Sequence, residues 1–234
     1  MIIKILQIVI LRLLLIACES GASEASQPGE AAYASGDFSG AYDVLSPLAA
    51  NGDANAQYVL GLMYANGQGV DQNFYAAGKM YRLAGEQGHA GAQVNLGSLF
   101  DNCHGNGGCN AEKAANWYRR AADQGEAIAQ YNLGVMYGVG RGVVENEWTA
   151  KSLFRKSAEQ GYAPAQFNLA VTYERGIGGP VDRIEAYAWY DLAASRGYED
   201  GNSGRSKVAA GLSEEELAKA DKLSALLRDS YNGE

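Results

Sequence analysis

A segment of about 36 residues recurs four times along the chain. The copies read NAQYVLGLMYANGQGV from Asn55, GAQVNLGSLFDNCHGN from Gly91, IAQYNLGVMYGVGRGV from Ile128 and PAQFNLAVTYERGIGG from Pro164. Their glutamines, spaced 36, 37 and 36 residues apart, are Gln57, Gln93, Gln130 and Gln166. A second ladder, spaced 37, 36 and 36, consists of Gly88, Gly125, Gly161 and Gly197. Two ladders with one period indicate a repeat architecture.

Each copy has the pattern of two helices joined by a turn. In the first copy Leu60 and Tyr64 fall four residues apart, which places both on one helical face. Ala77 and Tyr81 share a stripe of a second helix, and Gly88 follows as a left-handed terminator. One such pair cannot bury both of its faces alone, so successive pairs must stack. The sequence therefore predicts an all-α protein, a right-handed α-solenoid superhelix of helix–turn–helix repeats.

The ladders also predict the limits of the repeats and of the segments around them. The four repeats are expected at 53–88, 89–125, 126–161 and 162–197, with a partial N-terminal repeat at 30–52 and a C-terminal cap at 198–234. Ser213 and Glu216 form a capping-box pattern ahead of an apolar run. We therefore expect a capping helix from Ser213 to Tyr231.

The first eighteen residues have the pattern of a targeting signal that is separate from the folded repeats. The run from Met1 to Ala17 is largely aliphatic but shorter than the roughly 20 apolar residues of a comfortable membrane span. The sequence Leu15-Ile16-Ala17-Cys18 resembles the lipobox of bacterial lipoproteins, in which the cysteine becomes the lipidated first residue. Arg12 interrupts the apolar run, so an ordinary cleaved signal, an uncleaved anchor and a cytosolic chain remain alternatives.

The lipobox resemblance implies a place in the cell. Residues 19–29 would be a flexible tether, and the protein would be held in the cell envelope by its lipid. In Gram-negative lipoproteins, an Asp directly after the lipidated cysteine resembles an inner-membrane retention signal. This chain has Glu19 at that position, and the absence of Asp favours the periplasmic face of the outer membrane.

The net charge and the motifs of the sequence limit the classes of function that we expect. The chain has 19 basic and 27 acidic residues, a net charge of -8, so we do not expect it to bind nucleic acid. It has two histidines and none of the usual nucleophile, phosphate-loop or zinc-protease motifs. We therefore expect no catalytic residues and no cofactor.

The repeat pattern A-x-A-Q-x-x-L-G-x-x-Y-x-x-G-x-G-V, followed by A-x-x-W-Y-x-x-A-A-x-x-G, resembles the Sel-one-like repeat (SLR), a relative of the tetratricopeptide repeat. The resemblance spans about residues 30 to 200. It implies a non-catalytic scaffold or adaptor that binds a protein or peptide partner. Its oligomeric state stays open.

In solenoids of this kind the first helix of each pair lines the concave side. The residues expected to form a binding groove there are Tyr58, Asn95, Tyr131, Asn132, Phe167 and Asn168. The asparagines match a groove asparagine that contacts peptide backbone in tetratricopeptide domains. The alternative is structural: the amides bridge adjacent helices and the aromatic rings belong to the core.

Repeat 2 departs from the pattern with a loop that contains Cys103, His104 and Cys109. In an oxidising compartment the two cysteines are expected to form a disulfide. A metal site that recruits His104 is the alternative, but the spacing is not that of a usual zinc site, so we expect no metal.

Two other functions remain open from the sequence. Some cysteine-rich members of the resembled family bind or hydrolyse β-lactams, which suggests a β-lactam- or peptidoglycan-active enzyme, but this chain has one loop cysteine pair only. The other alternative is a regulatory subunit of an envelope enzyme.

Overall fold

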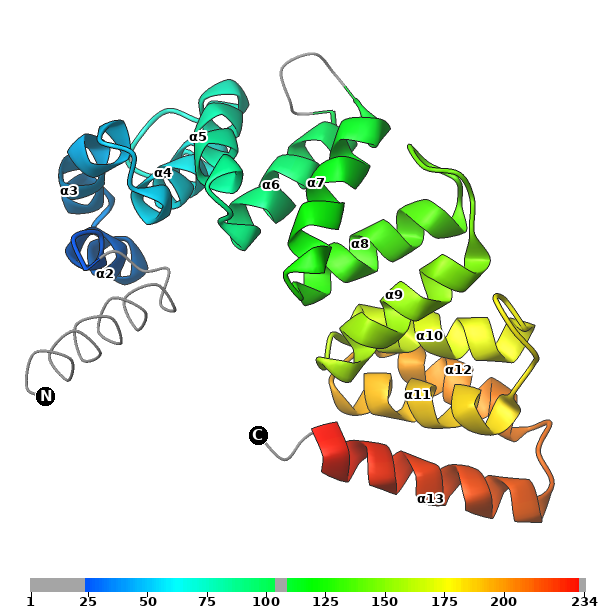
Figure 1. The fold of residues 1–234 in the computed structure, drawn as a ribbon. Coiled ribbons are helices and arrows are strands. Elements are labelled where there is room, and N and C mark those ends of the chain that lie inside the picture. The colour runs from blue at the N-terminus through cyan, green and yellow to red at the C-terminus, as the bar shows by residue number, and fades with distance from the viewer. Residues whose placement is uncertain (1–23, 104–108, 232–234) are drawn as a thin grey trace, which may run out of the picture. The chain divides into compact units, whose positions relative to one another are not determined.

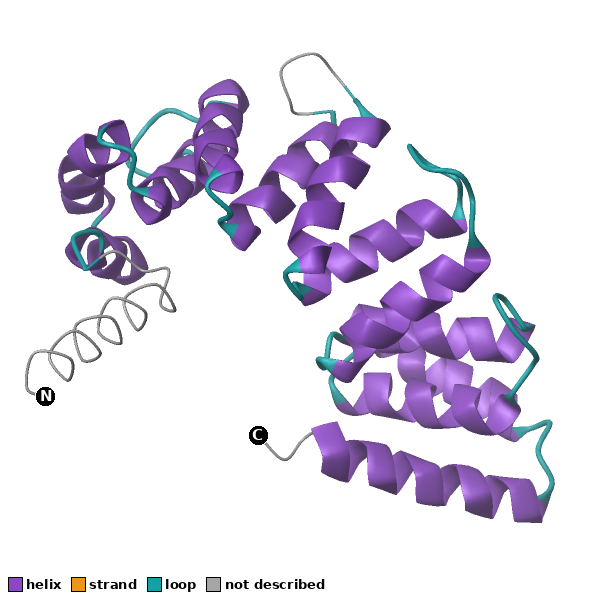
Figure 2. Ribbon diagram, in the orientation of Figure 1, coloured by secondary structure: helices purple, strands orange, loops and turns teal. Residues whose placement is uncertain are grey.

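The computed structural model describes residues 24–103 and 109–231, and the regular structure of these residues is entirely α-helical (Figure 1 and Figure 2). The expected signal segment, with Cys18, lies outside the described residues, and so does His104. The chain divides into two compact units, residues 1–109 and 110–234, and the boundary falls inside repeat 2. Each unit is described by itself.

The first unit holds five described helices. They are α2 (Gln27–Ser35), α3 (Phe38–Ala50), α4 (Ala54–Asn66), α5 (Phe74–Glu86) and α6 (Ala90–Asp101). Each helix packs on the next one in sequence, and α4 also touches α2 and α6 (Figure 1). The helices that open successive pairs, α2, α4 and α6, are therefore neighbours along one face of the unit.

The second unit holds seven described helices. They are α7 (Ala111–Asp123), α8 (Ala127–Gly138), α9 (Glu147–Glu159), α10 (Ala163–Arg175), α11 (Arg183–Ser195), α12 (Glu199–Ala209) and α13 (Glu214–Tyr231). Neighbours in sequence pack on one another from α7 to α12, and α13 packs on α11. This is the stacking of helix pairs that the repeat predicts.

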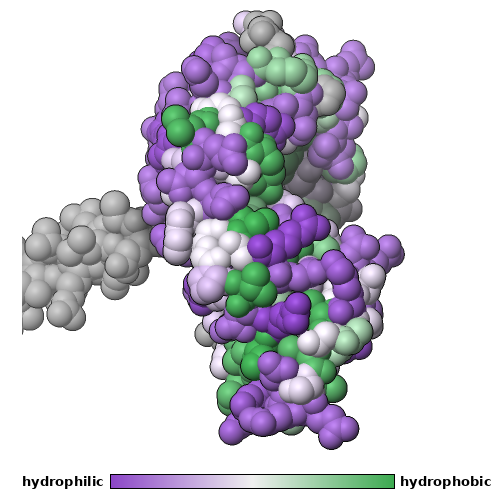
Figure 3. All heavy atoms as spheres, turned by 90° about the vertical axis from the view of Figure 1, so that its right-hand side faces the viewer, coloured by the Kyte–Doolittle hydropathy of each residue, from purple (hydrophilic) through white to green (hydrophobic). Residues whose placement is uncertain are grey.

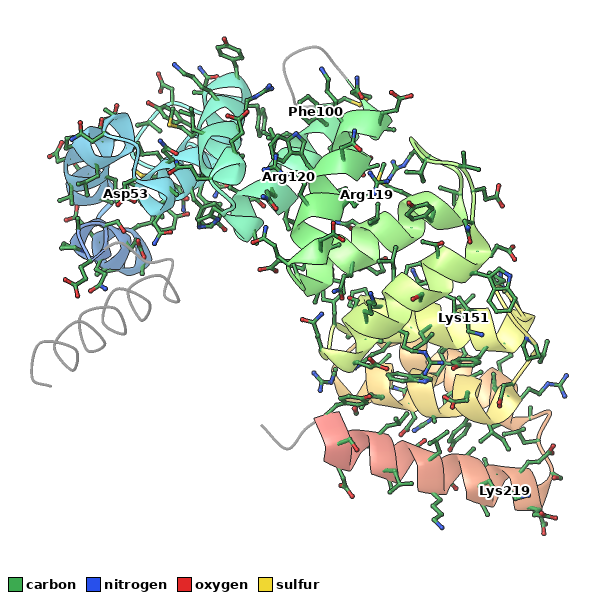
Figure 4. The ribbon with its side chains drawn as sticks, in the orientation of Figure 1. Asp53, Phe100, Arg119, Arg120, Lys151 and Lys219 are labelled. Carbon is green, nitrogen blue, oxygen red and sulfur yellow. A yellow bond between two sulfur atoms is a disulfide. The ribbon has the colours of Figure 1, made fainter. Side chains whose placement is uncertain are left out.

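Local sequence sets where each helix begins. Asp53 caps α4, because its carboxylate accepts a hydrogen bond from the backbone N–H of Ala56 at 2.8 Å (Figure 4). The second helix of every repeat is capped in the same way, by the side chains of Asn73, Asn110, Asn146 and Asp182. Gly67 ends α4 in the left-handed region at φ 69°, which a glycine adopts without strain.

Both ends of the array hold more helix than the sequence predicts. Because α2 begins at Gln27, the last three residues of the expected tether 19–29 are helical, and the segment expected as a partial repeat at 30–52 contributes to a complete helix pair. Pro28 at the helix start fixes a helical φ there, a signal that the sequence analysis passed over.

The C-terminal cap contains two helices rather than the expected one. The capping box forms as the sequence predicts: the Ser213 N–H donates to Glu216 Oε2 at 2.9 Å, and the Glu216 N–H donates to Ser213 Oγ at 3.3 Å. The additional helix is α12, which has a weak apolar pattern and buries only Gly201 and Val208. Burial against α11, rather than its own sequence pattern, accounts for this helix.

Small residues allow the helices of a repeat to approach closely. A Cβ at Gly61 of α4 would lie 2.5 Å from the ring of Tyr81 of α5, so only glycine fits there. The core of the first unit includes Ala41, Leu45, Ala56, Leu60 and Met63. In the second unit Trp189 and Leu192 of α11 are buried with Leu169 of α10. No described helix has both the length and the apolar character that crossing a membrane requires.

Candidate protein-binding surface

The repeating glutamine is a structural residue. Gln57, at the start of α4, donates its side-chain amide to the carbonyl of Ala49 at the end of α3, 3.1 Å away. The same bond recurs in the other three repeats, from Gln93 to Gly85 at 2.8 Å, from Gln130 to Ala122 at 3.4 Å and from Gln166 to Ala158 at 3.1 Å. Each glutamine thus adds a second hydrogen bond to a helix-end carbonyl that also accepts the backbone N–H of the residue three positions later.

The expected groove residues lie on first helices but in two separate sets. Tyr58 of α4 and Asn95 of α6 belong to the first unit. The set in the second unit comprises Tyr131 and Asn132 of α8, with Phe167 and Asn168 of α10. All six side chains are half-buried, so each presents part of its surface to solvent.

Each aromatic residue of the set packs on a ring at the N-cap of the next first helix. The pairs are Tyr58 with His89 at a centroid distance of 4.3 Å, Tyr131 with Tyr162 at 5.2 Å, and Phe167 with Tyr198 at 5.0 Å. The sequence analysis missed these partners. The sequence does contain a pattern that identifies them, because each partner directly follows one of the glycines that recur with the period of the repeat: Gly88, Gly161 or Gly197.

Two of the asparagines contact tyrosine hydroxyls within the fold. Burial raises the pKa of Tyr131, and a hydrogen bond with the Asn168 side chain works against that rise. Burial also raises the pKa of Tyr81, with the Asn95 side chain acting in the same opposing way. These amides therefore bridge helices while their half-buried position leaves part of each on the surface.

Aromatic, acidic and apolar side chains line an open cavity of about 310 Å³ in the first unit. Glu30 and Tyr33 of α2, Asn55 and Tyr58 of α4, and His89 at the start of α6 line this cavity. Of these residues the sequence analysis singled out Tyr58 alone. Glu30, Tyr33 and His89 come from other repeats, so no local motif connects them.

Basic side chains of second helices pack on tyrosines of the following first helix in the second unit. Arg119 of α7 donates to the Tyr137 hydroxyl at 3.3 Å, and Lys151 of α9 lies 4.0 Å from the centre of the Tyr173 ring (Figure 4). Such contacts are cation–π and charge-assisted interactions between consecutive repeats. These contacts stabilise the packing of consecutive repeats, and both basic side chains take part in that packing.

Exposed apolar side chains collect on the connections of the second unit. Val139 and Val144 lie in the α8–α9 connection, Trp148 near the start of α9, and Val181 in the α10–α11 connection. Trp148 is 71% exposed. Figure 3 shows apolar patches separated by polar side chains on the face that it draws. These four exposed side chains are not among the expected groove residues.

Cys103 and Cys109 are joined by a disulfide, with their Cα atoms 4.0 Å apart. The bond closes a short loop at the end of α6, so its effect is local. Among the described residues, no group of three or more histidines, cysteines or acids is placed to hold a metal ion.

Stacked helix pairs with a polar, aromatic face define a helical-repeat protein of the class that binds other proteins. The Sel1 repeat profile matches residues 54–89, 90–126, 127–162 and 163–198. The chain belongs to the Sel1 repeat family, whose repeats generally mediate protein–protein interaction. No curated protein matches the chain.

Several solved structures share this fold. A protective antigen of uropathogenic Escherichia coli strains with an SLR fold is 34% identical, with a TM-score of 0.76 over 82% of this chain. This chain spans only 41% of that antigen. A Sel1 repeat protein from Oxalobacter formigenes is 26% identical, with a TM-score of 0.76 over 91% of this chain and 88% of that one. An immunity protein from Pseudomonas aeruginosa is 18% identical, with a TM-score of 0.50 over 88% of this chain and 81% of that one, a likeness of fold alone.

Proposed function

We propose that the chain is a non-catalytic scaffold that binds a protein or peptide through the surfaces that the first helices of the repeats form within each unit. The observation that carries this proposal is the half-buried aromatic and amide side chains on the first helices of each unit, on α4 and α6 in the first unit and on α8 and α10 in the second. Amides can hydrogen-bond the backbone of an extended peptide, and tyrosine rings cover its side chains with little loss of rotamer freedom. Membership of the Sel1 repeat family supports the same role.

The test begins with the partner. The chain is crosslinked in its native cell, the captured protein is identified by mass spectrometry, and binding is then measured by calorimetry with both proteins purified. Tyr131→Ala and Asn132→Ala are expected to weaken binding by at least about tenfold, as for side chains that carry much of an interface. The matched control is Asn202→Ala, an exposed asparagine on α12. Equal affinity of all variants, with helicity retained, contradicts the proposed face.

The proposal includes a cellular location, which depends on the lipobox resemblance at Cys18. A lipid on Cys18 would hold the scaffold on the periplasmic face of the outer membrane, where its partner would be an envelope protein. Mass spectrometry of the mature N-terminus, isolated from the membrane fraction, tests this location. A chain that starts at Met1 without added lipid contradicts it.

The alternative to the scaffold function is a catalytic one. Hydroxyl–carboxylate hydrogen bonds join Ser26 to Glu30, Tyr187 to Asp221 and Tyr190 to Glu174, and none of these three pairs includes a histidine. Incubation of the purified chain with a β-lactam should therefore give neither turnover nor a covalent adduct. Hydrolysis or a stable mass increase would favour an enzyme of the β-lactam- or peptidoglycan-active kind.

A further inference from the structure

The cavity of the first unit has the size of a site for one side chain. Its volume of about 310 Å³ lies at the lower end of the range of about 300–1,000 Å³ found for ligand pockets. Its walls come from α2, α4 and the start of α6, helices that open three successive pairs. It therefore lies on the face to which the scaffold role is assigned.

The aromatic walls of this cavity are held in place by hydrogen bonds. The Tyr58 ring is stacked on the His89 ring, with an interplanar angle of 28°. His89 is itself fixed, because its Nδ1 accepts the backbone N–H of Ala92 at 3.1 Å. The Tyr33 hydroxyl donates to Gln68 Oε1 at 2.8 Å. The rings therefore need little reordering when a ligand enters.

The charge of the cavity is negative. Glu30 is half-buried and accepts a hydrogen bond from the Ser26 hydroxyl at 2.5 Å, a neutral donor that adds no positive charge. An Nδ1 that accepts a hydrogen bond carries no proton, so His89 is neutral in this arrangement. The described residues that line the cavity include no lysine or arginine. A cation is favoured here and an anion is repelled.

We infer that this cavity takes a positively charged side chain, arginine before lysine, presented by the partner that the scaffold binds. The faces of Tyr33 and Tyr58 attract a cation through their ring quadrupoles, and Glu30 supplies the opposite charge. A planar guanidinium can stack flat on a ring while its in-plane N–H groups bond a carboxylate, and an ammonium has no such plane. Asn55 at the rim has an amide that can hydrogen-bond the partner's backbone. The inference rests on the proposed scaffold function and names the partner's chemistry.

The first test uses small probes with the full chain. Acetyl-Gly-Arg-Gly-amide is titrated to tens of millimolar while the ring signals of His89 are followed by NMR; the chain has two histidines, and a His104→Gln variant assigns them. Saturable shifts of the His89 signals are expected. The citrulline peptide, which keeps the shape and loses the charge, should bind at least about fivefold more weakly. Equal binding of the two peptides, or no shift with arginine, overturns the inference.

Matched variants locate the site. Glu30→Gln should weaken arginine binding by about two- to fivefold, and Glu86→Gln, the same change at an exposed position of α5, should not. Tyr58→Val should remove most of the binding while the fold persists, since Val94 occupies the equivalent position of repeat 2. Unchanged binding in Glu30→Gln, or an equal loss in Glu86→Gln, overturns the inference.

The inference and the proposed function fail separately. If the captured partner still binds Glu30→Gln with full affinity but loses affinity for Asn132→Ala, the scaffold role stands and the cation site is wrong. If no partner is captured, the scaffold role fails, and the peptide titration alone decides whether the cavity binds a cation.

Discussion

The side-chain amide of Gln57 donates to the backbone carbonyl of Ala49 and so joins the start of α4 to the end of α3. Its own oxygen accepts a hydrogen bond from Gln87 at the end of α5, at 2.8 Å. One buried residue thus connects three helices from two successive pairs. This geometry explains why a glutamine, rather than an apolar residue, recurs with the period of the repeat.

Replacement of Gln57 by alanine should destabilise the first unit by about 1–3 kcal/mol, because the change removes two hydrogen bonds, one to the Ala49 carbonyl and one from Gln87, although the carbonyl keeps its bond from the Gly52 N–H. Urea unfolding followed by circular dichroism measures this change. The control is Gln72→Ala, an exposed glutamine whose loss should cost less than about 0.5 kcal/mol. Equal losses in the two variants would mean that the buried bond contributes nothing special.

Two helical glycines of the first unit should respond to alanine in opposite ways. A Cβ at Gly61 would lie 2.5 Å from the Tyr81 ring, and such overpacking costs about 1–3 kcal/mol. At Gly78 the nearest atom is Leu99 Cδ1 at 3.5 Å, an ordinary contact. Gly78→Ala should therefore stabilise by about 0.5–1 kcal/mol through helix propensity. Thermal unfolding of both variants checks the sign, and a neutral Gly61→Ala would contradict the close approach.

One buried acid of α11 pairs with both helices of the C-terminal cap. Asp191 of α11, with 5% of its side chain exposed, pairs with Arg205 of α12 at 2.6 Å and also with Arg228 of α13. Removing one side of a buried ion pair costs about 3–5 kcal/mol, and the partial exposure of both arginines reduces this. We expect Asp191→Ala to cost about 1–3 kcal/mol.

The variant's effect should be confined to the end of the array. Hydrogen exchange in α12 and α13 should accelerate in Asp191→Ala while exchange in α8 stays unchanged. The surface pair of Lys219 with Glu215 serves as the control, since Lys219→Ala breaks an exposed i,i+4 contact that should contribute nothing measurable (Figure 4). Uniform protection across all helices of Asp191→Ala would contradict the attachment.

Stability should fall at alkaline pH. Burial raises the pKa of several tyrosines above the ordinary value of 10.0, among them Tyr81, Tyr131, Tyr173 and Tyr190. A raised pKa in the folded state means that the stabilisation is complete below about pH 10 and is lost as the pH rises further, because the unfolded chain releases these protons first. Absorbance at the tyrosinate band, compared with that of the urea-unfolded chain, should show delayed ionisation. Coincident titrations of the folded and unfolded chains would contradict this prediction.

Part of the candidate surface could be read from the sequence. The register of the repeats placed Tyr58, Tyr131 and Phe167 at equivalent positions of first helices, and the structure puts them there. The charge around them could not be read, because Glu30 lies 28 residues before Tyr58 in sequence, in a segment expected to be only a partial repeat. No local pattern links an acid of one helix pair to a ring of the next.

The sequence by itself determined the repeat, its period and its all-helical character, since the apolar spacing and the glycines that end helices act within one or two turns of chain. Tertiary structure alone decided the role of each repeated residue: the glutamine as the partner of a helix-end carbonyl, Asn168 as a bridge to Tyr131, and Glu30 as the acid beside stacked rings. It also decided that α12 is a helix, through burial against α11. The physical reason is that these contacts join residues from different helices, whose distances are set by packing and not by spacing along the chain.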